Sequence, residues 1–440
     1  MARNLSTNDK IDHPTAVVMN MFYSGLGIAR SLGELGLPVV GLTSQRGIYG
    51  NFTRYANVRF CPDSKTDPEG LFAYLTGLAG QLGHRAIIFP TRDADLAFLD
   101  RFRERLSPHF EMVLPERSVL KLSLDKWETY KCAQRAGVST PKSWVIESDT
   151  DFNRIVPEIT YPVVLKPIAA DHWRHGNNWT LVGGRKAIAV SSQDELLAEY
   201  TAVARANPRV LVQELIQGSD EFLFIAACYF DKNSNCAASF NTRKLLQVPQ
   251  GFGTGCIVQT ANLPEVVETT VRLLAEMRFT GVAEVEYKWD SLKKEYRLIE
   301  INPRPWDQHR LGQSCGVDLI HFAYCEKAGL PQPKTAKGPI GLKWIAEDTF
   351  ITLAVRLIYR GDSMFWTLLR LARGKRIYAI WSWRDPLPAI AYCFGRFIPG
   401  LLGDGLSALG RALNFNAASK LFRKKDQVNG ERGEKGAAHG

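Results

Sequence analysis

The sequence predicts an open parallel α/β domain at the N-terminal end, a mixed α+β domain in the centre and an accessory helical segment after it. Three observations support this order. Residues 16–45 show the pattern strand, glycine turn, helix and strand; residues 121–330 mix strands with helices and end in a hairpin; residues 331–425 are rich in aromatic residues and arginine. A chain of 440 residues has room for about two or three domains.

The N-terminal domain, residues 1–120, is predicted from its opening βαβ unit. An apolar run at 17–19 forms the first strand, Gly25 and Gly27 permit a turn, and Gly36 stops the helix that follows. The two glycines alone are weak evidence for a dinucleotide site. Open parallel sheets do, however, bind ligands at the C-terminal ends of their strands.

After this βαβ unit, a further strand is predicted at 87–89, and Arg92 and Asp93 come soon after it. This position places both side chains at a strand's C-terminal end, where we expect a substrate. Capping of the next helix explains Asp93 equally well.

The composition is that of a globular protein, with 45% hydrophobic and 23% charged residues. The eight cysteines include no CxxC pair, which argues against a zinc cluster and for reduced thiols. No apolar h-region precedes the first strand, so we expect no signal peptide and a cytoplasmic enzyme. The net charge of +10 suits nucleic acid, a membrane or acidic small molecules and does not distinguish them.

Residues 331–425 contain no apolar stretch of 18 or more, because Arg356, Arg370 and Arg396 interrupt it, so this segment is not expected to span a membrane. Its helices are compatible with peripheral contact with a bilayer through a basic face. The alternative is an apolar face packed on the body of the protein. The tail SKLFRKKDQVNGERGEKGAAHG, from Ser419 onward, is basic and poor in apolar residues, and its final part, 426–440, is predicted to be disordered.

Residues 281–304, GVAEVEYKWDSLKKEYRLIEINPR, contain two strands joined by a polar loop. Side chains alternate faces along a strand. The alternation therefore groups Glu284, Glu286 and Lys288 on the first strand, and Leu298, Glu300 and Asn302 on the second. An antiparallel register sets Glu286 opposite Glu300 and Glu284 opposite Asn302, and like charges opposed in this way destabilise a sheet.

Three alternatives would relieve this repulsion: a bound cation, neighbouring Lys and Arg residues, or a different register that exposes both carboxylates. Mg²⁺ is usually held by one or two carboxylates together with substrate phosphates. Glu286, Glu300 and the amide oxygen of Asn302 fit that requirement. Arg304, two residues beyond, suits an anionic substrate.

Five motifs then follow one another along the chain: LDKWETYKCAQRAGVSTPKSW, YPVVLKP, VQELIQGSDE, TRKLLQVPQGFGTG, and GVAEVEY with LIEINPRPW. In this order they resemble the ATP-grasp superfamily, most closely its carboxylate–amine ligase branch, which is kin to biotin carboxylase and the carbamoyl-phosphate synthetases. The resemblance covers residues 15–330. It implies a two-lobed ATP-grasp domain at 121–330, preceded by the α/β domain that is usual in this superfamily.

The resemblance also implies roles for individual residues. Lys126 and Lys166 would contact the ATP phosphates, with Lys166 also near the adenine. The strand Glu214, Leu215 and Ile216 would read the adenine, and Glu221 would hold the ribose, with Asp220 as the alternative. Glu286, Glu300 and Asn302 would bind Mg²⁺ or Mn²⁺. Arg243 or Lys244, with Arg304, would face the transferred phosphoryl group and the substrate carboxylate.

The sequence departs from the family at residues 171–179, where relatives carry a small glycine-rich flap. Here bulky residues, His172, Trp173, Arg174 and His175, precede Gly176. The loop is expected either to close over ATP or to contribute to the acceptor site. The residues expected to line the acceptor pocket are Arg92, Asp93, Trp306, Asp307, Gln308 and His309.

The function implied is an ATP-dependent ligase that activates a carboxylate as an acylphosphate and joins it to an amine. The expected partners are ATP, a small carboxylate and an amine, with no nucleic acid; a homo-oligomer is compatible with the sequence. A phosphotransferase on the same scaffold, a non-catalytic nucleotide-binding protein and a membrane-surface protein are the alternatives.

Overall fold

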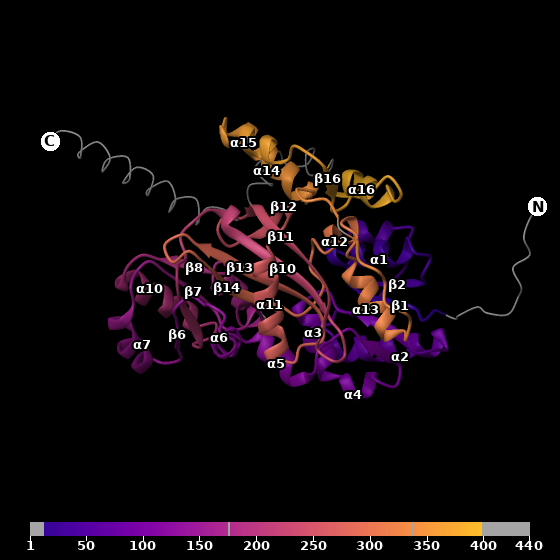
Figure 1. The fold of residues 1–440 in the computed structure, drawn as a ribbon, viewed down its shortest axis with the longest axis horizontal. Helices are drawn as coiled ribbons and strands as arrows, with labels where there is room; N and C mark the ends of the chain where they lie inside the picture. Colours follow the sequence, from indigo (N-terminus) through magenta and orange to yellow (C-terminus); the bar gives the residue numbers. More distant parts are fainter. Residues whose placement is uncertain (1–12, 175–176, 337, 398–440) are drawn as a thin grey trace, which may run out of the picture.

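The computed structural model describes residues 13–174, 177–336 and 338–397. They form three sheets, of five, seven and four strands (Figure 1). The predicted combination of a parallel α/β domain with mixed α+β structure is confirmed. Within these residues, no helix is long and apolar enough to cross a bilayer.

The N-terminal domain is a parallel sheet with the strand order β3-β2-β1-β4-β5. Its strands are β1 (Ala16–Met19), β2 (Val39–Thr43), β3 (Asn57–Phe60), β4 (Ala86–Phe89) and β5 (Phe110–Met112). Its main helices are α1 (Tyr23–Gly33), α2 (Pro68–Leu82) and α3 (Asp93–Arg101). The apolar run of β1 is buried on both faces, as a central parallel strand requires. Strand β4 delivers Arg92 and Asp93 to the edge where α3 begins.

The smaller lobe of the central region is an antiparallel sheet with the order β6-β9-β7-β8. Its strands are β6 (Ser143–Ile146), β7 (Val163–Pro167), β8 (Ile188–Val190) and β9 (Val210–Glu214). Helices α7 (Asp149–Ile155) and α10 (Gln193–Ala204) supply apolar side chains to the same core as these strands. Each of these helices begins at a serine whose hydroxyl accepts a backbone N–H, which explains where the helix starts.

The larger lobe is the sheet β14-β13-β10-β11-β12-β15-β16. Its first five strands are β10 (Leu223–Phe230), β11 (Cys236–Val248), β12 (Thr254–Ala261), β13 (Gly281–Asp290) and β14 (Glu295–Asn302). Helices α5 (Arg117–Leu124), α6 (Lys126–Arg135) and α11 (Pro264–Glu276) share one apolar core with its β10, β13 and β14 strands. On the opposite face, Ala227, Tyr229 and Val282 pack in a core with helix α13 (Leu319–Lys327), whereas Glu284 and Glu286 border the cleft between the lobes.

The C-terminal segment differs from the accessory helical unit that the composition predicts. It contributes two strands, β15 (Lys343–Ile345) and β16 (Arg376–Tyr378), to the large sheet, beside helices α14 (Glu347–Tyr359), α15 (Met364–Leu371) and α16 (Leu387–Tyr392). Three-residue strands carry too little periodicity to be recognised in a sequence rich in aromatic residues. The predicted disordered tail at 426–440 lies outside the described residues.

A buried ion pair joins the two ends of the described chain. Arg30 of α1 donates from Nε to Asp385 at 2.9 Å, and both side chains are fully buried. The guanidinium also donates to the carbonyls of Ala379, Ile380 and Asp385. Residues 379–385 are thus an integral part of the folded body. All eight cysteines are free, as expected.

Candidate active site

The hairpin of β13 and β14 has the predicted register. Glu286 lies opposite Glu300, and Glu284 lies opposite Asn302. The register shifts between Glu286 and Tyr287, because Tyr287 pairs with Leu298 and leaves Ile299 as an extra residue on β14. The expectation that Leu298 shares a face with Glu300 and Asn302 is therefore wrong.

The bulge decides which β14 side chains reach the cleft. Leu298 is fully buried and packs in the core with Tyr287 and Ile301, whereas Ile299 lines the cleft. A register of period two cannot reveal one inserted residue.

Lysines offset the repulsion between the opposed carboxylates. Lys244 of β11 donates to both oxygens of Glu286 at 2.8 Å, and Lys126 lies 3.8 Å from Glu300. Burial acts to raise the pKa of Glu300, but the charges of the surrounding lysines, Lys126 first, outweigh it and lower this pKa below its usual value. Of the three explanations, neighbouring cations are the one that the structure contains.

Glu284 is buried beside this pair and has a different charge state. Its carboxylate accepts a hydrogen bond from Asn302 Nδ2 at 3.0 Å. Burial, and then the neighbouring charge of Glu286, raises the pKa of Glu284 to about 8. The ionised carboxylate of Glu300 therefore lies near a glutamate, Glu284, that holds a proton at neutral pH.

These side chains line a cleft of about 570 Å³ between the two lobes, a volume in the range of small-molecule sites. Lysines converge on it from four elements or loops: Lys126 at the first position of α6, Lys166 near the end of β7, Lys186 before β8 and Lys244 on β11. Asp125 caps α6 by accepting from the N–H groups of Trp127 and Glu128, which fixes the direction in which Lys126 leaves the helix. Such a set of point charges suits a polyphosphate.

Lys166 is the most strongly perturbed of these lysines. It is buried at the penultimate position of an apolar strand. Burial, and then the charge of Lys126, lowers the pKa of Lys166 to about 7. A phosphate at this position would favour the charged form of the lysine.

The strand expected to read the adenine lines the same cleft. Glu214, Leu215 and Ile216 all contribute to its wall, and Ile216 is buried. The carboxylate of Glu214 is held at 2.9 Å from Arg297 and so does not reach for a ligand. An apolar wall of this kind suits a flat heterocycle.

The two candidates for the ribose have different surroundings. Asp220 accepts from the N–H groups of Gln247 and Gly251, and thereby fastens the loop after β11. Glu221 is exposed and is not among the residues that line the cleft, although Leu223 beside it is. The assignment of Glu221 to a ribose stays a prediction.

Arg243 does not reach the cleft. It is adjacent to Lys244 on β11 and therefore points to the opposite face of the sheet, where its guanidinium lies 3.5 Å from Gln259. Of the two candidates for contact with the transferred group, Lys244 alone lies in the cleft.

The acceptor end of the cleft joins the central region to the N-terminal domain. Arg304 donates from Nε to Asp93 at 2.7 Å, and Arg174 lies 3.9 Å from the same carboxylate. Burial opposes ionisation of Asp93, but Arg304 and then Arg174 outweigh it and lower this pKa. Asp93 is the first residue of α3 but does not cap it. The cap is formed by Arg92 and Asp95, and Asp93 pairs with Arg304.

Trp306, Asp307 and Gln308 line this end of the cleft, as expected, and Asp307 accepts from Ser24 at 2.8 Å. His309 does not line it. The ring is buried with Nε2 at 3.0 Å from the carbonyl of Ser24, packed against Gly27 of α1.

The loop at 171–179 contributes Trp173, Arg174 and Trp179 to the cleft wall. His175 and Gly176 lie outside the described residues. Lys65 and Lys186 are lining residues that the sequence reasoning missed. Lys186 donates to Thr254 at 3.0 Å, and burial followed by Arg174 lowers its pKa. The glycine pair directly before Arg185 and Lys186 is the sequence feature that points to a loop with basic side chains at this position.

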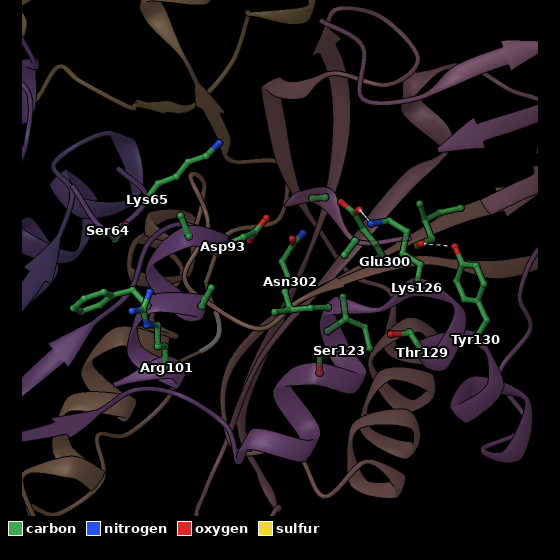
Figure 2. Close-up of a pocket in the computed structure, with 18 of the residues that line it drawn as sticks. Ser64, Lys65, Asp93, Arg101, Ser123, Lys126, Thr129, Tyr130, Glu300 and Asn302 are labelled. Atoms are coloured by element: carbon green, nitrogen blue, oxygen red, sulfur yellow. Dashed lines mark hydrogen bonds and ion pairs between the residues drawn. The ribbon is translucent and has the colours of Figure 1, made fainter. Parts of the chain in front are cut away.

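A second cavity, of about 270 Å³, lies behind the lysine and carboxylate cluster. Figure 2 shows Lys126 and Glu300 at its rim with Asn302 beside them, and Asp93 approaching from α3. Tyr130 donates to the carbonyl of Ile299 at 2.7 Å and holds the bulge in place. The remaining wall is mostly apolar, and the cavity lies between β14 and residues of the N-terminal domain.

No group of three or more His, Cys, Asp or Glu side chains within the described residues forms a metal site by itself. Glu286, Glu300 and the Asn302 amide oxygen supply hard oxygen donors for Mg²⁺ or Mn²⁺, and they fit an ion whose coordination is completed by phosphate oxygens.

Residues 125–330 match the family model for the ATP binding domain of the carbamoyl-phosphate synthase L chain. The chain is 20% identical to D-aspartate ligase of Enterococcus faecium over 307 residues, which are 67% of this chain and 72% of that protein. It is 29% identical to D-alanine–D-alanine ligase of Nitrosospira multiformis over 99 residues, 22% of this chain and 29% of the relative.

Among solved structures, biotin carboxylase of Campylobacter jejuni, determined as a β,γ-ATP complex, superimposes with a TM-score of 0.60 and 17% identity, covering 74% of each chain. At this identity the likeness shows the fold.

Proposed function

We propose that this chain, as a member of the carboxylate–amine ligase branch of the ATP-grasp superfamily, uses ATP to activate a small carboxylate as an acylphosphate and then joins it to an amine. The single observation that carries the proposal is the pairing of Glu286 with Glu300 at one wall of a cleft that six lysines line. A neutral ligand would supply no anionic partner to these lysines, so the cleft favours an anionic ligand.

The nucleotide is proposed to lie between the lobes. Leu215 and Ile216, which line the cleft, would face the adenine. Glu221, which does not line it, would hold the ribose as the resemblance implies. Lys126, Lys166 and Lys186 would take the phosphates as point charges. Mg²⁺, bound by Glu286, Glu300 and Asn302, would neutralise charge that develops on the phosphoryl group during transfer.

The acceptor end supports the carboxylate role. Arg304 presents a fixed guanidinium, which matches a carboxylate in a bidentate geometry. A carboxylate oxygen attacks the terminal phosphorus, the bond to ADP breaks, and Lys244 stays near the charge on the transferred group. The acylphosphate then loses phosphate when an amine attacks its carbonyl carbon, and the amine's proton leaves with it. Catalysis of this kind rests on positioning and on electrostatic stabilisation.

Asp93 and Asp307 favour an amine as the second substrate. Both carboxylates face the cleft close to Arg304, and Asp307 is oriented by Ser24. An ammonium group is a suitable partner for both acids, whereas a hydroxyl acceptor would need only one of them, as a base.

The experiment is a screen of amino acids and small carboxylates, singly and in pairs, with the full chain, ATP and Mg²⁺. We expect phosphate release that depends on both substrates, with an amide found by mass spectrometry. A phosphorylated product would indicate a phosphotransferase, and nucleotide binding without phosphate release under any pair would indicate a sensor. Glu300→Gln should lower phosphate release by about 100-fold or more, since a transition-state charge contact is removed. Glu268→Gln, at an exposed position of α11, should be unaffected.

A further inference from the structure

The C-terminal segment exposes large apolar side chains to a degree seen nowhere else in the described chain. Of fifteen such exposed residues, seven lie between 358 and 394. The aromatic ones are Tyr359 at 72% exposure, Trp366 at 70%, Trp383 at 86% and Phe394 at 68%. Exposed apolar side chains gathered in one segment in this way indicate an interaction site.

These residues come from consecutive elements that share one side of the molecule. Figure 1 shows α15, α14, β16 and α16 one after another along the upper edge of the view. Within α16 and the turn of helix after it, the exposed Leu387, Ile390 and Phe394 recur at the spacing of one helical stripe.

The same stretch is cationic. Six basic side chains between 349 and 397 are exposed: Arg360, Arg370, Arg373, Lys375, Arg376 and Arg384. Among the described residues of this stretch, no acidic side chain is exposed: Asp385 is buried against Arg30, and Asp362 is half-buried and caps the N–H of Met364. The charge is therefore uncompensated at this surface.

Aromatic residues together with basic ones are the composition of a surface that binds the interfacial region of a membrane. Trp and Tyr favour the level of the headgroups, and Lys and Arg favour anionic lipids. A protein partner with an acidic face would explain the arginines but not four exposed aromatic rings next to them.

We propose that the surface formed by residues 358–394 docks this enzyme on a bilayer of anionic lipid. It attaches peripherally, because no described helix can cross a membrane. The docking surface lies on α14, α15, α16 and the turns between them, apart from the residues that line the nucleotide cleft. Docking therefore leaves the cleft residues free to work, and it does not depend on the reaction proposed above.

The test uses the full chain and flotation with vesicles of phosphatidylcholine alone or with one third phosphatidylglycerol. Removal of everything after residue 338 is unsuitable, because it would delete two strands of the large sheet and leave Arg30 buried without Asp385. We expect binding to the anionic vesicles only, and a loss of binding at high salt.

Point variants separate this surface from the rest of the chain. Arg370→Glu with Lys375→Glu should weaken vesicle binding by at least about 25-fold, since each cation near an anionic surface contributes about fivefold. Trp366→Ser with Trp383→Ser should also weaken it. The matched controls, Lys121→Glu with Lys232→Glu and Leu292→Ser, alter exposed residues elsewhere and should bind as the wild type does.

Three outcomes would overturn the proposal. Equal flotation with neutral and anionic vesicles would remove the charge argument. Binding that survives both double substitutions would assign it to other basic residues, such as those after 397. Dissociation of an oligomer by the tryptophan variants in sedimentation, without any vesicle binding by the wild type, would show that a second copy covers this surface.

Discussion

The ammonium nitrogen of Lys244 lies 2.8 Å from each carboxylate oxygen of Glu286. Both side chains are buried, and both line the cleft. Burial works against the charged lysine, but Glu286 and then Glu284 raise its pKa above the usual value. In the protein without nucleotide, Lys244 is therefore the cation that competes with a divalent ion for Glu286.

Replacement of Lys244 should separate metal binding from turnover. In Lys244→Met, Mn²⁺ should bind to the nucleotide-free protein about tenfold more tightly or better, since a neighbouring unit charge is worth a few kcal/mol near a protein surface. Phosphate release should fall sharply, because the transferred group loses its cation. Electron paramagnetic resonance of free Mn²⁺ measures the affinity, with Lys232→Met as the control. Unchanged Mn²⁺ affinity would contradict the competition.

Nucleotide affinity should depend on pH through Lys166. Its pKa of about 7 means that the side chain is mostly neutral at pH 8.5 in the free protein, whereas a bound phosphate favours the ammonium. The dissociation constant of a non-hydrolysable ATP analogue should therefore increase between pH 7 and pH 9, and binding should take up a proton. Calorimetry in two buffers of different ionisation enthalpy detects both.

Lys166→Arg is the matched control, because a guanidinium stays charged across this range. Its affinity should vary less with pH than that of the wild type. An identical pH profile in both proteins would assign the effect to another group.

The sequence predicted those parts of the site that depend on strand alternation. Glu286 opposite Glu300 and Glu284 opposite Asn302 follow from period two and an antiparallel turn, and both pairs are present. Arg243 and Lys244 could not be separated, because the face of β11 that borders the cleft depends on how the two lobes pack. The bulge at Ile299 was likewise hidden, since one extra residue leaves no mark in composition.

The C-terminal segment was predicted least well. Strands β15 and β16 have three residues each and exist because neighbouring strands offer hydrogen bonds to them. Arg30 sits in the predicted first helix, yet its partner Asp385 lies 355 positions away. Such long-range pairings are set by tertiary packing, and local patterns do not contain them.

Stability should respond to pH through Glu284. Its pKa is raised from 4.5 to about 8, so between these values the folded protein holds a proton that the unfolded chain lacks. The stabilisation is present in full below pH 4.5 and is lost as pH rises through about 8. Glu284→Gln keeps a neutral side chain at all pH values, so its stability relative to the wild type should increase from pH 5.5 to pH 8.5. Urea unfolding without nucleotide or metal measures this; Glu268→Gln should show no such trend, and a pH-independent difference would contradict the assignment.

The buried pair of Arg30 and Asp385 should dominate the attachment of the C-terminal segment to the N-terminal domain. Arg30→Met removes the partner of a fully buried carboxylate together with three hydrogen bonds to carbonyl groups, and should destabilise the protein by about 3–5 kcal/mol. The comparison is Arg85→Met, which breaks an exposed pair with Glu111 and should cost about 1 kcal/mol or less. Urea unfolding followed by tryptophan fluorescence measures both values, because Trp381 and Trp383 closely precede the buried aspartate in sequence. The loss of the Arg30 guanidinium should loosen residues 379–385 first, and hydrogen exchange should rise there before it rises in β1. Asp385 keeps its hydrogen bonds from Thr53 at 2.6 Å and from the N–H of Arg54. Equal unfolding free energies for the two variants would show that the segment is held by its apolar contacts instead.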